Sequence, residues 1–369
     1  MLPAPVQNSA PVVSLTSAFG NSIQQKFLRK QTSQCKNSKP LWLLDYTAAP
    51  LHAILSLFFF LIIFNGSLFA QDTISNPNLQ QADTTTKSIP HKKRQHLIIT
   101  VNILGYGGSL IILNNTWYKN YPRTSFHTFN DSKEWLQVDK VGHAWTAYNT
   151  GKVSAGMWRW AGLSNEKAVI IGGASGAAYL TVIEFLDAHS AKWGWSWADM
   201  GANIFGSSLF IAQELSWKEQ HIQFKFSFHK KNYPDVTLEK RADDLFGKTW
   251  YERMLKDYNG QTYWLSTNLH SFFQSSKIPK WLNVAVGYGA EGLFGGFENK
   301  WTDGDPGFPI NRTDVKRQRQ FYIAPDIDFT KIKTNSKFLR TAFYFLNAFK
   351  FPAPAIEFSD KIKLKAVAF

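Results

Sequence analysis

Cysteine is almost missing from this sequence, because Cys35 is the only one among 369 residues. A single cysteine cannot form a disulfide within the chain, and it excludes metal sites built from several thiolates. Charged residues are also scarce, at 18% of the chain, whereas aromatic residues reach 15%. Low charge combined with many aromatic side chains indicates contact with lipid or, alternatively, a large aromatic core.

Long hydrophobic runs are lacking as well. The apolar run at 51–64 has the length of a signal-peptide core and is too short for a comfortable membrane span. Leu68 and Ala70 suit cleavage before Gln71, which predicts an exported protein. An uncleaved signal anchor is the alternative. The long basic region ahead of the run leaves open whether residues 1–50 are translated.

Acidic residues are outnumbered by basic ones. The net charge is +14, and removal of residues 1–70 leaves 36 basic and 26 acidic residues, a net +10. A basic exported protein is expected to face anionic membrane lipid or glycolipid. No nucleic-acid-binding motif is visible, so nucleic acid is not an expected partner. No cysteine follows the predicted cleavage site that could carry a lipoprotein anchor.

The pattern along the chain predicts an exported protein with four regions. A leader with a signal peptide occupies 1–70, and a linker rich in Asn, Gln, Thr and Lys, which we expect to be disordered, occupies 71–95. Residues 96–216 hold four stretches with helical character, none of which is a continuous run of about 18 apolar residues. These stretches are 97–113, 131–160, 168–183 and 196–215. A compact lipid-contacting bundle and true membrane spans both fit them.

Beyond Trp217 the helical period gives way to alternating apolar and polar residues. Residues 217–369 therefore form a β-rich domain, with short helices expected at 241–255 and 337–349 and a solvated basic loop at 316–319. The predicted fold class is α+β: a membrane-associated bundle of about four helices, then a small open antiparallel sheet of about five strands. Those strands are centred on 224–228, 263–269, 282–288, 320–329 and 362–365.

Three polar pairs stand at helical spacing on otherwise apolar segments, which places each pair on one helix face. We expect three helices to bring them to one buried site. The alternative is three separate structural roles, with Ser196 as a helix cap and the carboxylates at helix ends emerging into water. The pairs are Asp139 with His143, Glu184 with Asp187, and Asp199 with Asn203.

If the site assembles, its residue types suit two kinds of chemistry. His143, Glu184 and Asp199 can bind a divalent metal through nitrogen and oxygen. With Asp187, they can instead act as catalytic acids and bases on a lipid-linked phosphate or sugar. Asn203 would orient a partner or a substrate oxygen. The remaining binding residues are Asp139, Ser196 and Lys140, whose charge can neutralise a carboxylate.

The three motifs are DKVGHAWTAY, EFLDAHSAKWGWSW and DMGANIFG. They resemble a family of uncharacterised bacterial envelope proteins, domain of unknown function 2279 (DUF2279), which includes YfiM-type lipoproteins. The resemblance covers about residues 95–215 and implies an envelope location without supplying a reaction. The missing cysteine departs from the lipoprotein members. The family pattern falls on Asp139, Lys140, His143, Glu184, Asp187, Ser196, Asp199, Asn203 and Gly206.

A more distant likeness is to VanZ-like membrane proteins, which are linked to glycopeptide resistance. Asp187 stands where that family tends to carry an amide. Two functions remain open from the sequence. The first is an envelope enzyme or ligand-binding protein acting on a lipid- or glycan-linked substrate, at the outer-membrane or periplasmic face. The second is a structural or assembly protein of the outer membrane, in which the polar residues only lock helices together.

Overall fold

The computed structural model describes residues 91–369, apart from 117, 119–120 and 304–306. The predicted leader at 1–70 and residues 71–90 of the predicted linker lie outside the described residues. Helix α3 begins at His91, so the last part of the segment expected to be disordered is helical.

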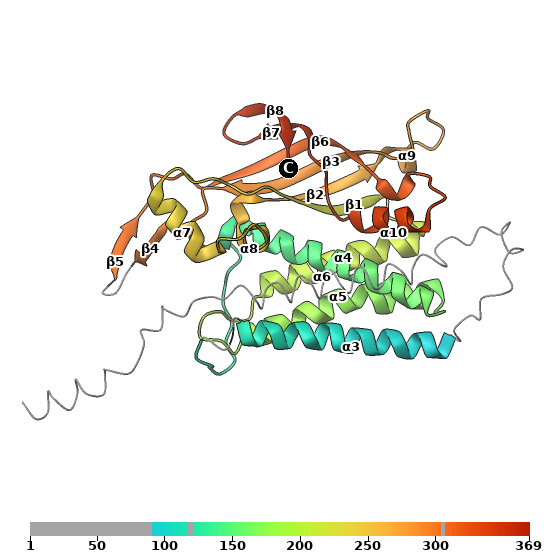
Figure 1. The fold of residues 1–369 in the computed structure, drawn as a ribbon, viewed down its shortest axis with the longest axis horizontal. Helices are drawn as coiled ribbons and strands as arrows, with labels where there is room; N and C mark the ends of the chain where they lie inside the picture. Colours follow the sequence, from blue (N-terminus) through green and yellow to red (C-terminus); the bar gives the residue numbers. More distant parts are fainter. Residues whose placement is uncertain (1–90, 117, 119–120, 304–306) are drawn as a thin grey trace, which may run out of the picture. The chain divides into compact units, whose positions relative to one another are not determined.

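The first described elements are long helices that overlap the four stretches with helical character (Figure 1). Helix α5 packs against both α4 and α6. Its glycines make this possible, since a Cβ atom at Gly172 would lie only 2.2 Å from the backbone nitrogen of Ala155 on α4. By length and composition, α3 and α5 are apolar enough to cross a membrane. The helices are α3 (His91–Thr116), α4 (Val138–Trp160), α5 (Asn165–Asp187) and α6 (Trp197–Trp217).

The second half of the chain builds one antiparallel sheet in the order β1-β2-β3-β6-β7-β8, with a separate β4-β5 pair inserted between β3 and β6. The strands are β1 (Ile222–Phe228), β2 (Gln261–Asn268), β3 (Leu282–Glu291), β4 (Lys300–Asp303), β5 (Phe308–Asn311), β6 (Gln318–Ile327), β7 (Ala353–Phe358) and β8 (Ile362–Ala368). The short helices are η3 (Glu134–Gln137), α7 (Val236–Phe246), α8 (Trp250–Lys256), η4 (Tyr258–Gly260), α9 (Leu269–Phe272), η5 (Phe329–Lys331) and α10 (Lys337–Leu346).

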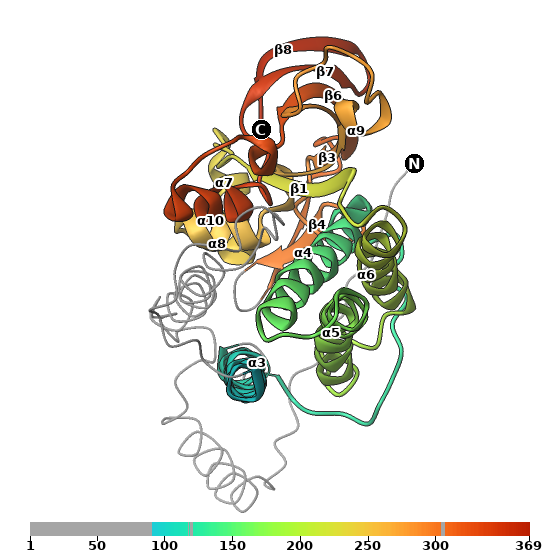
Figure 2. The same ribbon diagram turned by 90° about the vertical axis from the view of Figure 1, so that its right-hand side faces the viewer.

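Helices and sheet share one hydrophobic core. Its residues come from both sides of the domain boundary that the sequence predicted at 216/217. Phe224 and Phe226 of β1 and Tyr263 of β2 are buried together with Tyr148 of α4 and Phe210 of α6. The Tyr148 ring meets the rings of Phe210 and Phe224 edge-on, at centroid distances of 6.1 and 6.2 Å. Each such buried aromatic side chain contributes roughly 1.5–3 kcal/mol. Figure 2 shows β1 lying beside α4.

The mixed helix and sheet architecture was predicted correctly, but the sheet has six strands rather than about five. The strand of this sheet that the sequence did not reveal is β7, which contains Pro354, a residue that disfavours strands. Proline is tolerated there because the pairing of β7 with β8 is irregular between Ala353 and Ala355. The single helix expected at 241–255 is instead two, α7 and α8, separated at Gly247, whose φ of +85° suits glycine.

The start of α4 also differs from the expectation. The helix predicted from residue 131 begins at Val138, because three residues in a row adopt left-handed backbone conformations. These are Trp135, Leu136 and Gln137, with φ of 49°, 50° and 66°. Such conformations cost L-residues roughly 1–2 kcal/mol each, so surrounding contacts must stabilise them.

Contacts from the sheet region stabilise this left-handed turn. The backbone N–H of Trp135 donates to the carbonyl of Gly296 at 2.7 Å. The Tyr288 hydroxyl of β3 donates to the Leu136 carbonyl, and Arg319 of β6 donates to the Gln137 side chain at 2.6 Å.

The face of the sheet opposite the helices holds a buried polar cluster, here called the sheet cluster. Lys225 and Asp326 are 0% and 1% exposed, and Lys225 Nζ lies 2.8 Å from Asp326 Oδ2. Ser266 donates to the same carboxylate oxygen at 2.6 Å, and Asn283 donates to Ser266 at 2.9 Å. Asn268 donates to Asn283 at 2.8 Å. One cation and one anion therefore meet within a chain of hydrogen bonds.

Candidate functional site

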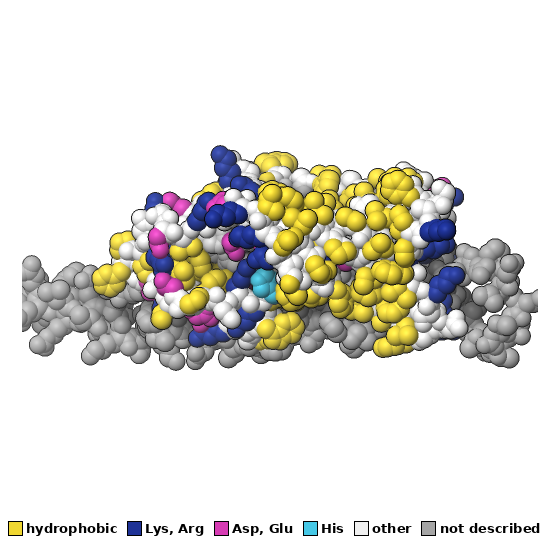
Figure 3. All heavy atoms as spheres, turned by 90° about the horizontal axis from the view of Figure 1, so that it is seen from above, with side chains coloured by type: hydrophobic (Ala, Val, Ile, Leu, Met, Phe, Trp, Pro, Cys, Tyr) yellow, Lys and Arg dark blue, Asp and Glu magenta, His cyan; other side chains and the backbone are white. Residues whose placement is uncertain are grey.

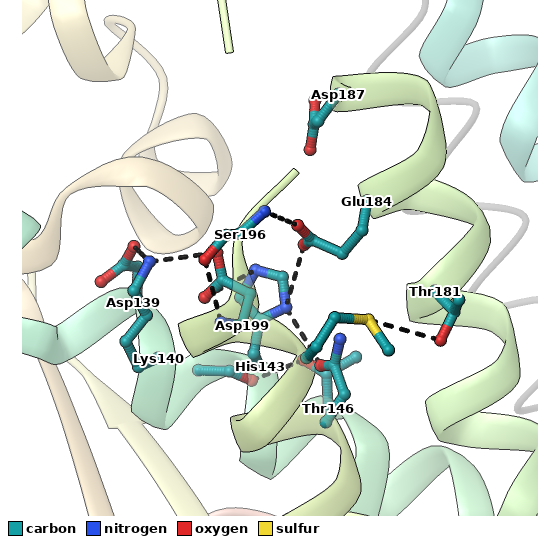
Figure 4. A network of polar contacts seen from close by, with 12 residues as sticks. Asp139, Lys140, His143, Thr146, Thr181, Glu184, Asp187, Ser196 and Asp199 are labelled. Atoms are coloured by element: carbon teal, nitrogen blue, oxygen red, sulfur yellow. Dashed lines mark hydrogen bonds and ion pairs between the residues drawn. The ribbon is translucent and has the colours of Figure 1, made fainter. Parts of the chain in front are cut away.

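The three polar pairs predicted from the sequence meet where α4 begins, α5 ends and α6 begins (Figure 4). His143 points from α4 toward Glu184 of α5 and Asp199 of α6. Glu184 and Asp199 are buried, whereas the His143 side chain is 25% exposed. We call this group the helix centre, and His143 is its most exposed member.

Lys140 is the main positive charge of the helix centre. Its ammonium group lies 2.5 Å from Asp131, 2.9 Å from Asp139 and 3.0 Å from Asp199. Burial alone would lower the pKa of Lys140, but the carboxylates of Asp139 and Asp199 raise it. Lys140 is therefore a permanent cation that holds three carboxylates together.

Asp131 is a member of this centre that the sequence did not reveal. It accepts a hydrogen bond from the Ser196 hydroxyl at 2.5 Å in addition to the one from Lys140. Ser196 caps α6 as expected, because its hydroxyl accepts from the Asp199 backbone N–H at 3.0 Å. The Ser196 N–H donates to Glu184 at 3.2 Å, which links α5 to the same cap.

Asn203 fixes the orientation of the His143 ring. Its Oδ1 atom lies 3.1 Å from Nδ1 of His143. An amide oxygen only accepts, so Nδ1 carries a proton. The Nε2 atom faces Oδ1 of Asp199 at 3.8 Å, and Glu184 Oε1 lies 3.9 Å from Nδ1. At these distances neither carboxylate oxygen forms a hydrogen bond with the imidazole.

Burial and like charge raise the pKa values of the carboxyl groups around His143. Burial raises the pKa of Glu184 to about 8, and the charges of Asp199 and Asp187 add to the effect. Burial likewise raises the pKa of Asp139 to about 6, against the lowering effect of Lys140. Among the described residues, Asp199 Oδ1 and Asn203 Nδ2 are buried without a hydrogen-bond partner.

Two groups of residues bring potential metal ligands within 4.8 Å of one another. In the group of Asp131, Asp139 and Asp199, the Lys140 ammonium already neutralises the carboxylates. In the group of His143, Glu184 and Asp199, Lys140 pairs only with Oδ2 of Asp199, so among the described residues neither Glu184 nor Oδ1 of Asp199 has a lysine or arginine within ion-pairing distance. The second group is therefore the better candidate for a cation.

Asp187 lies apart from the metal-ligand group, although it follows Glu184 by one helical turn. It accepts a hydrogen bond from the Tyr118 hydroxyl at 2.7 Å. Burial raises its pKa to about 6, and the hydrogen bond from Tyr118 opposes this. Tyr118 also lines a hollow of about 210 Å³ together with Phe185 and His189. Asp187 thus connects the end of α5 to this hollow rather than to the imidazole.

Gly206, the last residue of the sequence motif, sets the distance between α4 and α6. A Cβ atom at this position would lie 2.0 Å from the carbonyl oxygen of Ala144. Ala144 directly follows His143, and Gly206 lies one turn beyond Asn203. The close backbone contact therefore brings the imidazole within hydrogen-bonding reach of its amide partner.

All of these residues except Tyr118 fall within one segment that matches a known family. Residues 128–213 match the family described as predicted periplasmic lipoprotein (DUF2279). The resemblance predicted from the motifs is confirmed for this segment, and it supports an exported protein of the cell envelope. The likeness to VanZ-like proteins stays a prediction. No curated protein and no solved structure matches the chain.

Proposed function

We propose that this envelope protein binds a divalent cation at His143, Glu184 and Asp199, and that the loaded helix centre binds or processes a lipid- or glycan-linked substrate. One observation carries the proposal. His143 Nε2 faces the unpartnered Oδ1 of buried Asp199 at 3.8 Å. A buried acceptor without a partner costs about 1–3 kcal/mol, and a cation held between the two atoms would satisfy it.

The spacing and the supporting residues suit a metal ion. Two donors in a tetrahedral site with bonds near 2.1 Å are about 3.4 Å apart, so His143 and Asp199 need to approach by only a few tenths of an ångström. The hydrogen bond from His143 Nδ1 to Asn203 is the kind of second contact that orients a metal-bound imidazole. Three protein ligands would leave a position open for water or substrate.

Access and compartment favour a substrate of the envelope. His143 is the partly exposed member of the centre, so a phosphate or sugar group would approach from its side. In the cation-free centre, Glu184, with its pKa raised to about 8, holds a proton at neutral pH that it can donate, and Asp199 can accept one. A bound cation would displace that proton and take Glu184 as a ligand. Asp187 would take part through its hydrogen bond from Tyr118, which lines the neighbouring hollow. We place the protein at the periplasmic or outer-membrane face, in contact with membrane lipid or glycolipid.

The second candidate is a structural or assembly protein of the outer membrane. The observation favouring it is the bonding of Lys140 to three carboxylates from the α4 region and α6. A purely structural role, in which the network holds the helices of the bundle together, is sufficient to explain these contacts. In that case the cation would bind weakly or not at all, and loss of any member would destabilise the fold.

Titration calorimetry and thermal unfolding with Zn²⁺, Mn²⁺ and Mg²⁺ separate the two candidates. We expect one cation per chain and a higher Tm on binding, because a ligand at 100 times its Kd stabilises by about 2.7 kcal/mol. His143→Gln should weaken binding at least tenfold. His189→Gln is the matched control, since His189 contacts the backbone of Phe185 outside the centre. No binding of any of the three cations would overturn the cation proposal.

A further inference from the structure

The sheet carries an apolar face that the helices cover only in part. One row of directly paired residues crosses all six strands on this face. Its first member, Phe224, is 4% exposed beneath the helices, whereas its last, Leu364, is 84% exposed. The row consists of Phe224, Leu265, Val286, Ile323, Ile356 and Leu364.

A second row of paired residues shows the same change, from side chains covered by the helices to side chains exposed to solvent. It begins with Phe226 and Tyr263, which are buried in the core shared with the helices. It ends with Phe321, Phe358 and Ile362, which are exposed although no polar residue interrupts them. The uncovered part is thus a continuation of an established hydrophobic interface. Figure 3 shows hydrophobic side chains gathered over this side of the molecule, with Lys and Arg at the border.

These apolar side chains cannot become buried by exchanging the two faces of the sheet. The other face is already packed, because it holds the sheet cluster with buried Lys225 and Asp326 and, beside it, a hydrophobic cluster that includes Trp264 and Tyr322. Exposure of the apolar face is therefore fixed by the strand register, since a shift of one residue would exchange the two faces. Exposed apolar areas of this kind mark contact with another protein or with a membrane.

A basic hollow of about 330 Å³ lies at the border of the apolar face. Phe321 and Phe358 from the second row line it, together with Lys316, Arg317 and Arg319. The only acidic residue lining it is Asp360, which pairs with Lys316. The run 316–319 is not the solvated loop expected from the sequence, because Gln318 and Arg319 begin β6. The hollow thus has excess positive charge next to aromatic side chains.

We propose that this face docks on a bilayer, with acyl chains against the two apolar rows and the phosphate headgroup of an anionic lipid in the basic hollow. The positive charge of the hollow and the continuous apolar surface select this occupant over a second copy of the chain, which would bring like charges together. The proposal does not depend on the helix centre. It stands or falls separately from cation binding.

An environment-sensitive fluorophore at residue 364 tests the proposal directly. Leu364→Cys in a Cys35→Ser background provides one labelling site, because the chain has no other cysteine. Val236→Cys is the matched control, since Val236 is also 84% exposed but begins α7. Helices α3 and α5 are apolar enough to enter a membrane themselves, so binding to vesicles alone is not the readout.

With phosphatidylglycerol vesicles, we expect the label at 364 to shift to the blue and to be quenched by nitroxide-labelled lipid, while the label at 236 is unchanged. Arg319→Gln should lower the preference for phosphatidylglycerol over phosphatidylcholine about fivefold, because each basic residue near an anionic surface contributes about 1 kcal/mol. Lys248→Gln, in the α7–α8 connection, should leave it unchanged. Thermal unfolding of each variant shows that it is folded.

Two results would overturn the proposal. The first is a label at 364 that stays in water when the protein is bound to vesicles. The second is a blue shift without lipid that grows with protein concentration and coincides with a dimer in analytical ultracentrifugation. That result would assign the face to a second copy of the chain.

Discussion

The helix centre and the sheet cluster are both buried groups of charged and polar side chains, but they differ in charge balance. The sheet cluster pairs one lysine with one aspartate, and neither side chain is among those with a buried, unpartnered polar atom. The helix centre gathers four carboxylates around one lysine and one histidine, and some of its buried atoms lack partners. Those carboxylates belong to Asp131, Asp139, Glu184 and Asp199.

The difference separates a polar network that stabilises a fold from one that costs stability. A balanced network offsets the loss of hydration of each buried charge with a charged partner. An unbalanced one leaves like charges close together, so some carboxyl groups keep a proton or require a cation. The helix centre therefore has the properties of a binding site, whereas the sheet cluster has those of a structural element.

The largest effect that we predict is on the sheet cluster. Lys225→Met leaves the buried Asp326 carboxylate without its cation, which should cost about 3–5 kcal/mol in the free energy of unfolding. Denaturant unfolding at neutral pH measures this change in the free energy of unfolding. Lys240→Met is the control, because Lys240 is 56% exposed and its ion pairs should contribute less than about 1 kcal/mol. Equal effects of the two substitutions would contradict the structural role of the sheet cluster.

The next effect is the pH dependence of stability without divalent cations. Glu184 has a folded pKa raised to about 8 from its ordinary 4.5, so the folded state binds the proton more tightly. Its contribution is complete below pH 4.5 and is lost as the pH rises through 8. We expect a loss on the order of 2–4 kcal/mol between pH 5 and 9. Glu184→Gln should flatten the curve, and parallel curves for variant and parent would exclude this role for Glu184.

A smaller effect tests the backbone contact that brings the helix centre together. Gly206→Ala places a methyl group against the Ala144 carbonyl and should cost about 1–3 kcal/mol. It should also weaken cation binding by separating His143 from Asn203. Gly201→Ala on the same helix meets no atom within 4 Å and should stabilise by up to about 1 kcal/mol. If both alanine variants bind the cation equally, the contact does not position the site.

The smallest effect on stability is expected for Asp199→Asn. Lys140 keeps Asp131 and Asp139 as partners, and an amide at residue 199 can donate toward His143 Nε2. The free energy of unfolding should change by less than about 1 kcal/mol, whereas cation affinity should fall at least tenfold. A loss as large as that for Lys225→Met would place Asp199 in a structural network instead. Chemical denaturation and titration calorimetry measure the two quantities.

Residue spacing predicted the parts of the helix centre that lie on helices. Asp139 with His143, and Asp199 with Asn203, share helix faces, and the structure brings His143 and Asn203 within hydrogen-bonding distance. Asp131 escaped this reasoning because it precedes the left-handed turn, where helical spacing does not apply. Only the tertiary fold shows that it contacts Lys140.

The sheet shows a second limit of the sequence. Alternation revealed most strands, but it does not tell which face the helices cover. Lys225, between Phe224 and Phe226, is expected to be exposed on an amphipathic strand, yet it is fully buried, while Leu364 is exposed. The burial of Lys225 depends on its ion pair with Asp326, which is about 100 residues away in the sequence. No local sequence pattern encodes that pairing.

The left-handed turn at Trp135, Leu136 and Gln137 makes the helix centre mechanically dependent on the sheet. Asp139 and Lys140 follow it immediately, while its carbonyl and side-chain contacts go to Tyr288 of β3 and Arg319 of β6. Because its backbone is strained, the turn would relax if those strands moved away. The position of Asp139 and Lys140 therefore depends on β3 and β6, through the three residues of this turn.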